Sequence, residues 1–253
     1  MDIESTIENQ IAVIRFARPQ KKNAITREMY ATLTRAVLDA SANPAVRSVL
    51  FTGQPGIFTA GNDLQDFMLH AADAEPPSVA FMRALVACEK PVIAAVTGLA
   101  VGIGATMLLH CDLVYVADEA RLTTPFVGLG LVPEFASSLL LPALVGQAKA
   151  AEMLMLGDPI GAAEAVSLGI ANAALPADEV FSHASRVAER FNALAPTAVR
   201  ETKRLMKRSG SSAVRQAIEV EVEAFVRGLG GPEAREAIGA FFEKRKPDFS
   251  RFA

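Results

Sequence analysis

The chain has 253 residues, of which 51% are hydrophobic and 21% are charged, and its formal net charge is −3. This composition excludes a disordered chain, and the length suits one large hydrophobic core or two smaller ones. The slight acidic surplus and the absence of tryptophan argue against nucleic acid and against an anionic membrane surface as partners. Such ligands need a basic field or aromatic stacking platforms.

The sequence carries no mark of an oxidising compartment. Its two cysteines, Cys88 and Cys111, do not make a disulfide framework. Residues 1–5 are acidic and lack the apolar stretch of a signal peptide. We therefore expect a cytoplasmic protein.

Strands and helices alternate in the first half of the chain. Apolar runs predict strands over residues 11–16, 46–52, 91–96 and 113–117. After the first strand, Thr26 offers an N-cap for a helix over 27–41, which ends before Pro44. A glycine-rich loop over 53–64 and a polar, then helical segment over 66–88 follow the second strand. This alternation predicts an α/β fold with a buried, largely parallel sheet.

One uncharged stretch is long enough to raise the question of a membrane span. Residues 92–109 are eighteen positions without a charge, which is the nominal length of a spanning helix. Gly98, Gly102 and Gly104 interrupt the stretch and would destabilise one continuous helix. We therefore predict a buried strand, a glycine turn and a buried helix, and no membrane span.

Helical segments dominate from about Pro133 onward. The predicted helices cover residues 135–144, 148–156, 162–168, 179–194, 197–209, 213–228 and 233–244. A late strand over 170–174 is the exception. The chain therefore divides into a β/α body and a helical tail, and a tail that cannot bury both its faces would pack against another subunit.

The glycine turn at residues 97–106 allows three interpretations. Gly102 and Gly104 supply two glycines of a dinucleotide-binding fingerprint, but Met107 occupies the third position, so that motif is incomplete. Glycines that open a helix also leave backbone N–H groups free, which makes an anion or oxyanion site. Close packing of the helix on a strand would need the same glycines, and this is the commonest cause of the pattern when it stands alone.

A second glycine-containing segment lies at residues 57–64. Ala60 and Gly61 are small enough to let a ligand approach the backbone closely. Asp63 could instead cap a helix after an ordinary surface turn, which is the commoner role of an Asx residue in a loop.

Together these segments identify a family. The chain resembles the crotonase (enoyl-CoA hydratase/isomerase) family over nearly its whole length. The resemblance rests on seven runs in the same order, at residues 18–25, 58–64, 90–98, 102–104, 111–112, 168–172 and 242–247.

The resemblance implies a fold and a ligand. It implies a spiral of ββα units over residues 1–195, which contain the CoA and active sites, and a helical oligomerisation region over 196–253. Homotrimers, or dimers of trimers, would result. The ligand would be an acyl-CoA thioester, with coenzyme A as part of the substrate and no separate cofactor. The peptide N–H groups of Asn62 and Ile103 would hold the thioester oxygen and stabilise an enolate.

Two positions depart from the pattern of the family's hydratases. Those enzymes use two glutamates to position and activate a water molecule. In this chain Thr106 and Phe126 occupy the two positions. The resemblance therefore gives poor support to ordinary enoyl-CoA hydration.

Glu134 stands where the family's enoyl-CoA isomerases carry their catalytic acid, and residues 124–138 resemble the peroxisomal-type 3-enoyl/2-enoyl isomerases. One carboxylate suffices to move a proton from C2 to C4, because no water enters the reaction. Phe126, Leu129 and Phe135 would raise its pKa if they pack around it. Pro133 and Glu134 could also be the first turn of a helix, where both residue types are favoured.

The resemblance further implies a set of residues that contact the substrate. They are Lys22, Ala24, Ala60, Gly61, Asp63, Leu64, Gly102, Gly104, Phe126, Phe241 and Lys244. Phe241 and Lys244 would reach the nucleotide bound by a neighbouring subunit. Lys22, Phe241 and Lys244 could equally be a solvated charge or ordinary helix packing.

The remaining polar residues have structural interpretations. His70, His110 and His183 are too far apart in sequence for a metal site, and His110 is expected to be a buried core residue. We expect Asp63 to order its loop and Asp112 to cap a turn. The basic residues at 203–204 and 207–208 predict a solvated helix face, with CoA phosphates as a possible ligand.

We therefore predict an acyl-CoA isomerase that shifts a 3-enoyl double bond to the 2-position, with Glu134 as the proton shuttle. Three alternatives remain open. The chain could be a hydratase with an unusual water site, or a ring-forming or ring-opening CoA isomerase of aromatic degradation. It could also be a non-catalytic protein that binds acyl-CoA.

Overall fold

The computed structural model describes residues 2–69 and 75–252, so His70 lies outside the described residues. The larger of two sheets has six strands in the order β1-β2-β3-β5-β7-β10. Their bounds are β1 Ile3–Glu8, β2 Ile11–Phe16, β3 Ser48–Thr52, β5 Val92–Val96, β7 Leu113–Ala117 and β10 Ala173–Leu175. Within this six-stranded sheet, the β1–β2 pair is antiparallel and the other four pairs are parallel. The prediction of a largely parallel sheet is thus confirmed.

Both faces of this sheet are covered. Every residue of β3 and β5 is buried, as expected where helices lie on both sides of parallel strands. Leu50 and Ile93 pack against helix α8 (Ala177–Arg190) on one face. On the other face, α1 (Arg27–Ala42) and α3 (Ser78–Ala87) belong to the larger core.

The structure has a second, smaller sheet. Three of its strands each come directly after a strand of the larger sheet in the sequence. The smaller sheet has the order β4-β6-β8-β9, with bounds β4 Ile57–Thr59, β6 Leu99–Val101, β8 Arg121–Thr123 and β9 Ile160–Gly161. Strand β4 follows β3, β6 follows β5 and β8 follows β7, and a helix comes after each pair. This repeat confirms the ββα units. The strands β4, β6 and β8 were not predicted, because three residues are too few to show an alternating pattern.

Other boundaries were also close to those predicted. The Oγ1 atom of Thr26 accepts a hydrogen bond from the N–H of Met29, so the N-cap of α1 is confirmed. The remaining helices of the body are α2 Leu64–Leu69, α4 Ile103–Thr106, α5 Ser137–Val145, α6 Gln147–Ala151 and α7 Ala162–Ser167. Within the two described stretches, no helix is both long and apolar enough to cross a membrane. The uncharged run at 92–109 instead forms β5, β6, α4 and a 3-10 turn.

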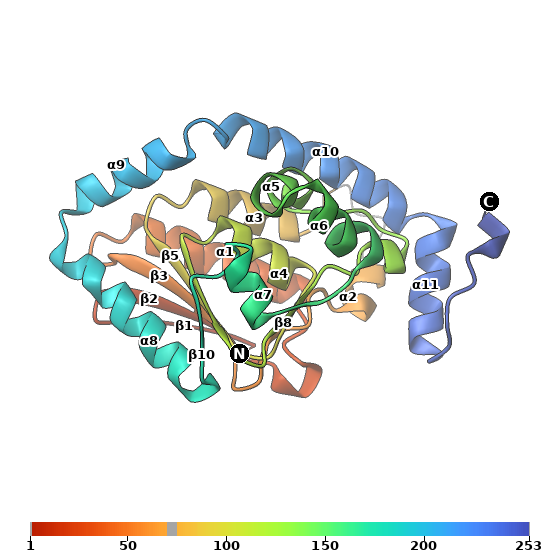
Figure 1. The fold of residues 1–253 in the computed structure, drawn as a ribbon, viewed down its shortest axis with the longest axis horizontal. Coiled ribbons are helices and arrows are strands. Elements are labelled where there is room, and N and C mark those ends of the chain that lie inside the picture. The colour runs from red at the N-terminus through yellow and green to blue at the C-terminus, as the bar shows by residue number, and fades with distance from the viewer. Residues whose placement is uncertain (1, 70–74, 253) are drawn as a thin grey trace.

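The tail helices wrap around the outside of the body (Figure 1). They are α9 Pro196–Lys207, α10 Ser211–Leu229 and α11 Pro232–Phe242. In Figure 1, α9 and α10 run along the upper edge of the body and α11 lies at one end of the molecule. Ile218, Glu221 and Phe225 of α10 are buried, so this helix presents one face to the body.

The prediction that the basic residues of α9 form a solvated face is wrong for Lys203. Lys203 is only 9% exposed, and its Nζ lies 2.7 Å from Oδ2 of Asp112. Lys207 approaches the other carboxylate oxygen at 3.1 Å. Asp112 does not cap the turn before it. Its side chain accepts a hydrogen bond from the N–H of Val92, so it joins the start of β5 to the tail.

Candidate active site

The two glycine segments lie directly against each other. Gly61 has φ +82°, and a Cβ atom there would be 2.7 Å from the carbonyl oxygen of Val101. A Cβ atom on Gly104 would be 2.5 Å from Cγ2 of Thr59. Both positions need glycine because side chains would overlap the facing segment. Close packing, one of the interpretations of the glycine turn, therefore applies, and it brings Asn62 next to the start of α4.

A third segment, residues 22–25, supports this arrangement from the other side. The N–H of Ala60 donates to the carbonyl of Lys22 at 3.0 Å, and the N–H of Ile25 donates to the carbonyl of Gly61 at 2.8 Å. The buried Asn23 donates its side-chain amide to the carbonyls of two residues of β4. Lys22 itself is exposed and left-handed, with φ 51°. Backbone hydrogen bonds thus join the segment of Lys22 and Ala24 to the segment of Ala60.

Asp63 fixes the end of the same loop. Its Oδ2 lies 2.7 Å from Nη1 of Arg18, and its Oδ1 accepts hydrogen bonds from the N–H groups of Gln65 and Asp66 at the start of α2. Leu64 is the first residue of that helix. The expectation that Asp63 orders its loop is confirmed.

Two backbone N–H groups are left free at the junction. In the part of the chain that the structure describes, no acceptor is found for the N–H of Asn62 or of Ile103. Ile103 is the first residue of α4, where N–H groups have no partner within the helix. A pair of free donors on adjoining segments suits an oxygen that gains negative charge. This arrangement matches the oxyanion-binding role expected of the two residues, which remains a prediction.

Glu134 lies in a buried loop. It is 3% exposed, and α5 begins only at Ser137, so its interpretation as part of a helical first turn is wrong. Within the described chain no donor reaches its Oε1 atom. Burial raises the pKa of Glu134 to about 8, and the nearby negative charge of Glu221 adds to the increase. A carboxyl group in this state can take up and release a proton near neutral pH.

Tyr30 is a site residue that the sequence did not reveal. Its hydroxyl donates to Oδ1 of Asn62 at 2.5 Å. Burial raises the pKa of Tyr30 well above its usual value, and the negative charge of Glu134 contributes. Tyr30 therefore bonds to Asn62 and lies within electrostatic range of Glu134. In the sequence, Tyr30 is one of several apolar residues on the buried face of α1, and nothing distinguishes it from a core aromatic.

Glu221 is the second residue that sequence reasoning missed. Its carboxylate accepts hydrogen bonds from the N–H of Ala136 at 2.5 Å, the N–H of Ser138 at 3.0 Å and the Oγ of Ser138 at 2.5 Å. Phe135 and Ala136 have φ values of 60° and 56°, which non-glycine residues rarely adopt. The tail helix α10 therefore holds the loop that carries Glu134. A glutamate on the buried face of an amphipathic helix was the available signal.

Thr106 and Phe126 line the site without a carboxylate. Thr106 is 1% exposed, and its Oγ1 has no partner among the described residues. A Cβ atom on Gly102 would lie 3.9 Å from Cε1 of Phe126, so the phenyl ring covers the glycine turn. Beyond Thr106 lies a small apolar cavity that Leu109, Leu122, Leu141, Met153 and Ile170 also line.

His110 supports the loop from behind. Its ring stacks on Phe135 with 4.0 Å between centroids, and its Nε2 lies 2.7 Å from the carbonyl oxygen of Phe135. Burial lowers the pKa of His110 to about 4, so the ring is neutral at neutral pH. The prediction of a buried core histidine is confirmed. Among residues 2–69 and 75–252, no group of three or more potential ligands could hold a metal ion.

Phe241 and Lys244 lie apart from these residues. Phe241 is 60% exposed near the end of α11, and Lys244 follows the helix on the surface. No described contact joins either side chain to Asn62, Ile103 or Glu134. Their expected role toward the nucleotide of a neighbouring subunit stays a prediction.

Comparisons with known proteins agree with this geometry. The sequence model of the enoyl-CoA hydratase/isomerase family matches residues 6–251. A probable enoyl-CoA hydratase of Mycobacterium leprae is 32% identical over 248 residues, covering 95% of this chain and 95% of the relative. The peroxisomal enoyl-CoA delta isomerase 3 of Mus musculus is 33% identical over 253 residues, covering 97% of this chain and 80% of that protein.

The solved structures agree as well. The structure of OdaA from Pseudomonas aeruginosa has a TM-score of 0.93 and 50% identity, with 95% of this chain and 98% of that chain covered. Both the predicted fold class and the family resemblance are thus confirmed. The chain belongs to the enoyl-CoA hydratase/isomerase family, whose enzymes act on CoA thioesters and need no cofactor beyond the CoA of the substrate.

Proposed function

We propose that this family member is an enoyl-CoA isomerase, which moves the double bond of a 3-enoyl-CoA to the 2-position. One observation carries the proposal. The buried carboxyl group of Glu134 acts electrostatically on Tyr30, whose hydroxyl bonds to Asn62, while Thr106 and Phe126 stand where the family's hydratases have their two glutamates. This set of groups can move a proton but is poorly equipped to activate water.

The proposed reaction begins when the thioester oxygen accepts hydrogen bonds from the N–H groups of Asn62 and Ile103. The carboxylate of Glu134 then removes a proton from C2. The electron pair of the broken C–H bond forms a dienolate, and the two N–H donors stabilise its oxygen. Glu134 returns the same proton to C4, which leaves the double bond between C2 and C3.

The environment of Glu134 suits this shuttle. A carboxylate with the usual pKa is a weak base toward a carbon acid, whereas burial that raises the pKa to about 8 increases its proton affinity. The same affinity would retain the proton until C4 accepts it. We propose that Phe126 keeps water out of this step, since its ring covers the glycine turn.

The binding roles complete the proposal. Backbone groups around Ala24, Ala60 and Leu64 would contact the CoA portion, because these segments border the free N–H groups. Residues 196–253 would serve as the oligomerisation region, since α9 exposes the apolar side chains of Leu205 and Met206.

One observation favours hydration as a second candidate. The Oγ1 atom of Thr106 is buried and has no partner among the described residues, and a buried hydroxyl of this kind can bind a water molecule. Hydration would then depend on a water positioned by Thr106 and activated by Glu134 alone.

The test measures two reactions side by side. Purified protein is given a linear 3-enoyl-CoA, and formation of the conjugated 2-enoyl thioester is followed. A parallel sample receives a 2-enoyl-CoA and reports loss of conjugation by hydration. We expect isomerisation, and a decrease of about 10³-fold in Glu134→Gln, which is within the usual contribution of acid–base catalysis.

The control variant is Glu119→Gln, which changes an exposed glutamate and should leave the rate unchanged. Hydration that survives in Glu134→Gln would contradict the proposal. Inactivity in both samples would also overturn it, and would point to a ring substrate or to acyl-CoA binding without turnover.

A further inference from the structure

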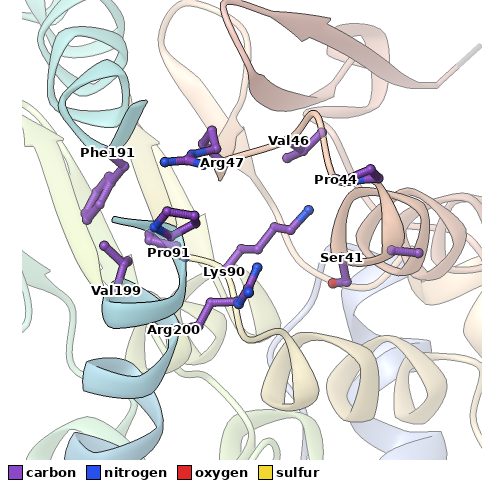
Figure 2. Close-up of a pocket in the computed structure, with 11 residues that line it drawn as sticks. Ser41, Pro44, Val46, Arg47, Lys90, Pro91, Phe191, Val199 and Arg200 are labelled. Carbon is purple, nitrogen blue, oxygen red and sulfur yellow. The ribbon is translucent and has the colours of Figure 1, made fainter. Parts of the chain in front are cut away.

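A second cavity, of about 330 Å³, lies between the body and the tail and contains none of the residues discussed above as catalytic. Arg47, Lys90 and Arg200 line it, and Figure 2 shows that they enter from three separate segments. Arg47 stands just before β3, Lys90 stands two residues before β5, and Arg200 is on α9. The side chains that line this cavity include no aspartate and no glutamate.

Lys90 brings a buried positive charge to the cavity. It is 5% exposed, and its Nζ donates to the carbonyl oxygens of Ala40 and Asn43 at the end of α1, both at 2.5 Å. An ammonium group has three donors, so one remains for a further acceptor. Burial lowers the pKa of Lys90, and the charges of Arg200 and Arg47 lower it further. The three cations therefore repel one another.

Arg200 is the least satisfied of the three. Its guanidinium group has no hydrogen bond or ion pair to any described residue. Its neighbours on α9 do have partners: Arg204 pairs with Glu201 and Lys203 pairs with Asp112. Arg47 uses one N–H group to reach the carbonyl of Leu194. Several N–H donors around the cavity are thus free.

We propose that this cavity is a binding site for a phosphate group. Three cations that line one cavity without a carboxylate among the lining side chains suit a dianion, and the planar guanidinium fork matches phosphate oxygens. The rest of the wall is apolar, including Val46, Pro91 and Phe191, so it can also accept the organic part of a small phosphate ester. The site would couple α9 to the starts of β3 and β5, and it does not depend on the proposed isomerase activity.

The test measures binding of sodium phosphate and of phenyl phosphate by isothermal titration calorimetry. Thermal unfolding is recorded in parallel, against sodium chloride at the same ionic strength. We expect phosphate to bind with a Kd on the order of a millimolar and to raise the Tm by several degrees at saturating concentration, because it binds only the folded state. Tighter binding of phenyl phosphate would identify an organic phosphate as the ligand, and equal binding would identify inorganic phosphate.

Two variants test whether phosphate binds in this cavity. Arg200→Gln and Arg47→Gln should each weaken phosphate binding at least tenfold. The matched control is Arg215→Gln, which changes an exposed arginine on α10 and should bind phosphate as the wild type does. Equal affinity in wild type and Arg200→Gln would overturn the proposal, as would a rise in Tm that sodium chloride reproduces.

The ligand-free variants give a second readout. Without an anion, Arg200→Gln removes a repulsive charge, so its Tm should equal or exceed that of the wild type. A purely structural arginine would behave in the opposite way: its replacement would lower the Tm and leave phosphate affinity unchanged. That result would refute the site.

Discussion

The two sides of the candidate active site are built in different ways. On the oxyanion side, backbone N–H groups of Asn62 and Ile103 lie on segments that glycines hold together within the body. On the acid side, the side chain of Glu134 lies on a loop that Glu221 of the tail holds in place. The first side depends on backbone shape and the second on side-chain chemistry and on α10. Substitutions should therefore affect the two sides differently.

Beside the loss already expected of Glu134→Gln, the largest effect on kcat should come from a substitution on the oxyanion side. In Gly61→Ala, the new Cβ would lie 2.7 Å from the carbonyl oxygen of Val101 and would push the Asn62 N–H out of position. Loss of one such donor lowers kcat by about 10²–10³, and we expect a decrease of this size in the isomerisation assay. Gly56→Ala is the matched control. It has the same positive φ, of 80°, but open space around its Cβ, so its kcat should stay near that of the wild type.

The acid side should respond to pH. Because the pKa of Glu134 is raised to about 8, the base is half ionised near pH 8 and mostly protonated below it. We expect kcat/KM to rise nearly tenfold for each pH unit well below 8 and to level off near 8, which is about fiftyfold between pH 6 and pH 8. A profile that is flat across this range would show that Glu134 is not the base.

The same pKa predicts the stability of the protein. The unfolded chain ionises Glu134 near its ordinary pKa, whereas the folded chain keeps it protonated until about pH 8. The contribution of Glu134 is therefore fully present below about pH 4.5 and is lost progressively as the pH rises to and through about 8. Each tenfold change in proton affinity corresponds to about 1.4 kcal/mol. Urea unfolding should show Glu134→Gln gaining a few kcal/mol over the wild type between pH 5 and pH 8.5.

A smaller effect tests the link to the tail. Glu221→Gln keeps the shape of the side chain but turns an amide N–H₂ toward one of the donors of Ala136 and Ser138. We expect kcat to fall about tenfold with little change in KM, and the pKa in the pH profile to move down because a negative charge near Glu134 is gone. Glu223→Gln, on the exposed side of the same helix, should change neither quantity. Equal effects of the two variants would remove Glu221 from the site.

The smallest effect sharpens the role of Asn62. Asn62→Ala keeps the backbone N–H, so activity should fall only two- to threefold, roughly the cost of a small shift in position. The free energy of unfolding should fall by about 1–2 kcal/mol, because the buried Tyr30 hydroxyl loses its acceptor. Tyr30→Phe removes the same bond and serves for comparison. A loss of activity as large as that of Gly61→Ala would contradict a backbone donor.

The same contrast explains what the sequence could reveal. Glycine patterns are local, so Gly61, Gly102 and Gly104 pointed to the oxyanion segments. The contact of Ala136 with Glu221 joins residues that are 85 positions apart, and no local pattern predicts such a pair. Tyr30 follows the same periodicity as its apolar neighbours. Family resemblance identified Glu134, but the groups that set its proton affinity required coordinates.

The fold shows the same division. The buried strand β7 and the capped helix α1 were predicted because their patterns are long and regular. Strand β1 was missed, because five of its six residues are exposed and show no alternation. Lys203 was predicted to be solvated, because a charge on a helix usually is. Its burial depends on Asp112, which approaches only when α9 packs against the body.

The contact between Glu221 and the acid loop also sets an order of events during synthesis. Glu134 leaves the ribosome 87 residues before Glu221 does. At roughly 5–20 residues per second, this delay is about 4–17 s. During this time strands β1 to β8 have already been synthesised, whereas the left-handed residues Phe135 and Ala136 still lack the carboxylate that fixes them. The nascent body can therefore bring Asn62 and Ile103 together before the loop of Glu134 is fixed, and we expect the proposed reaction to begin only after α10 has been made.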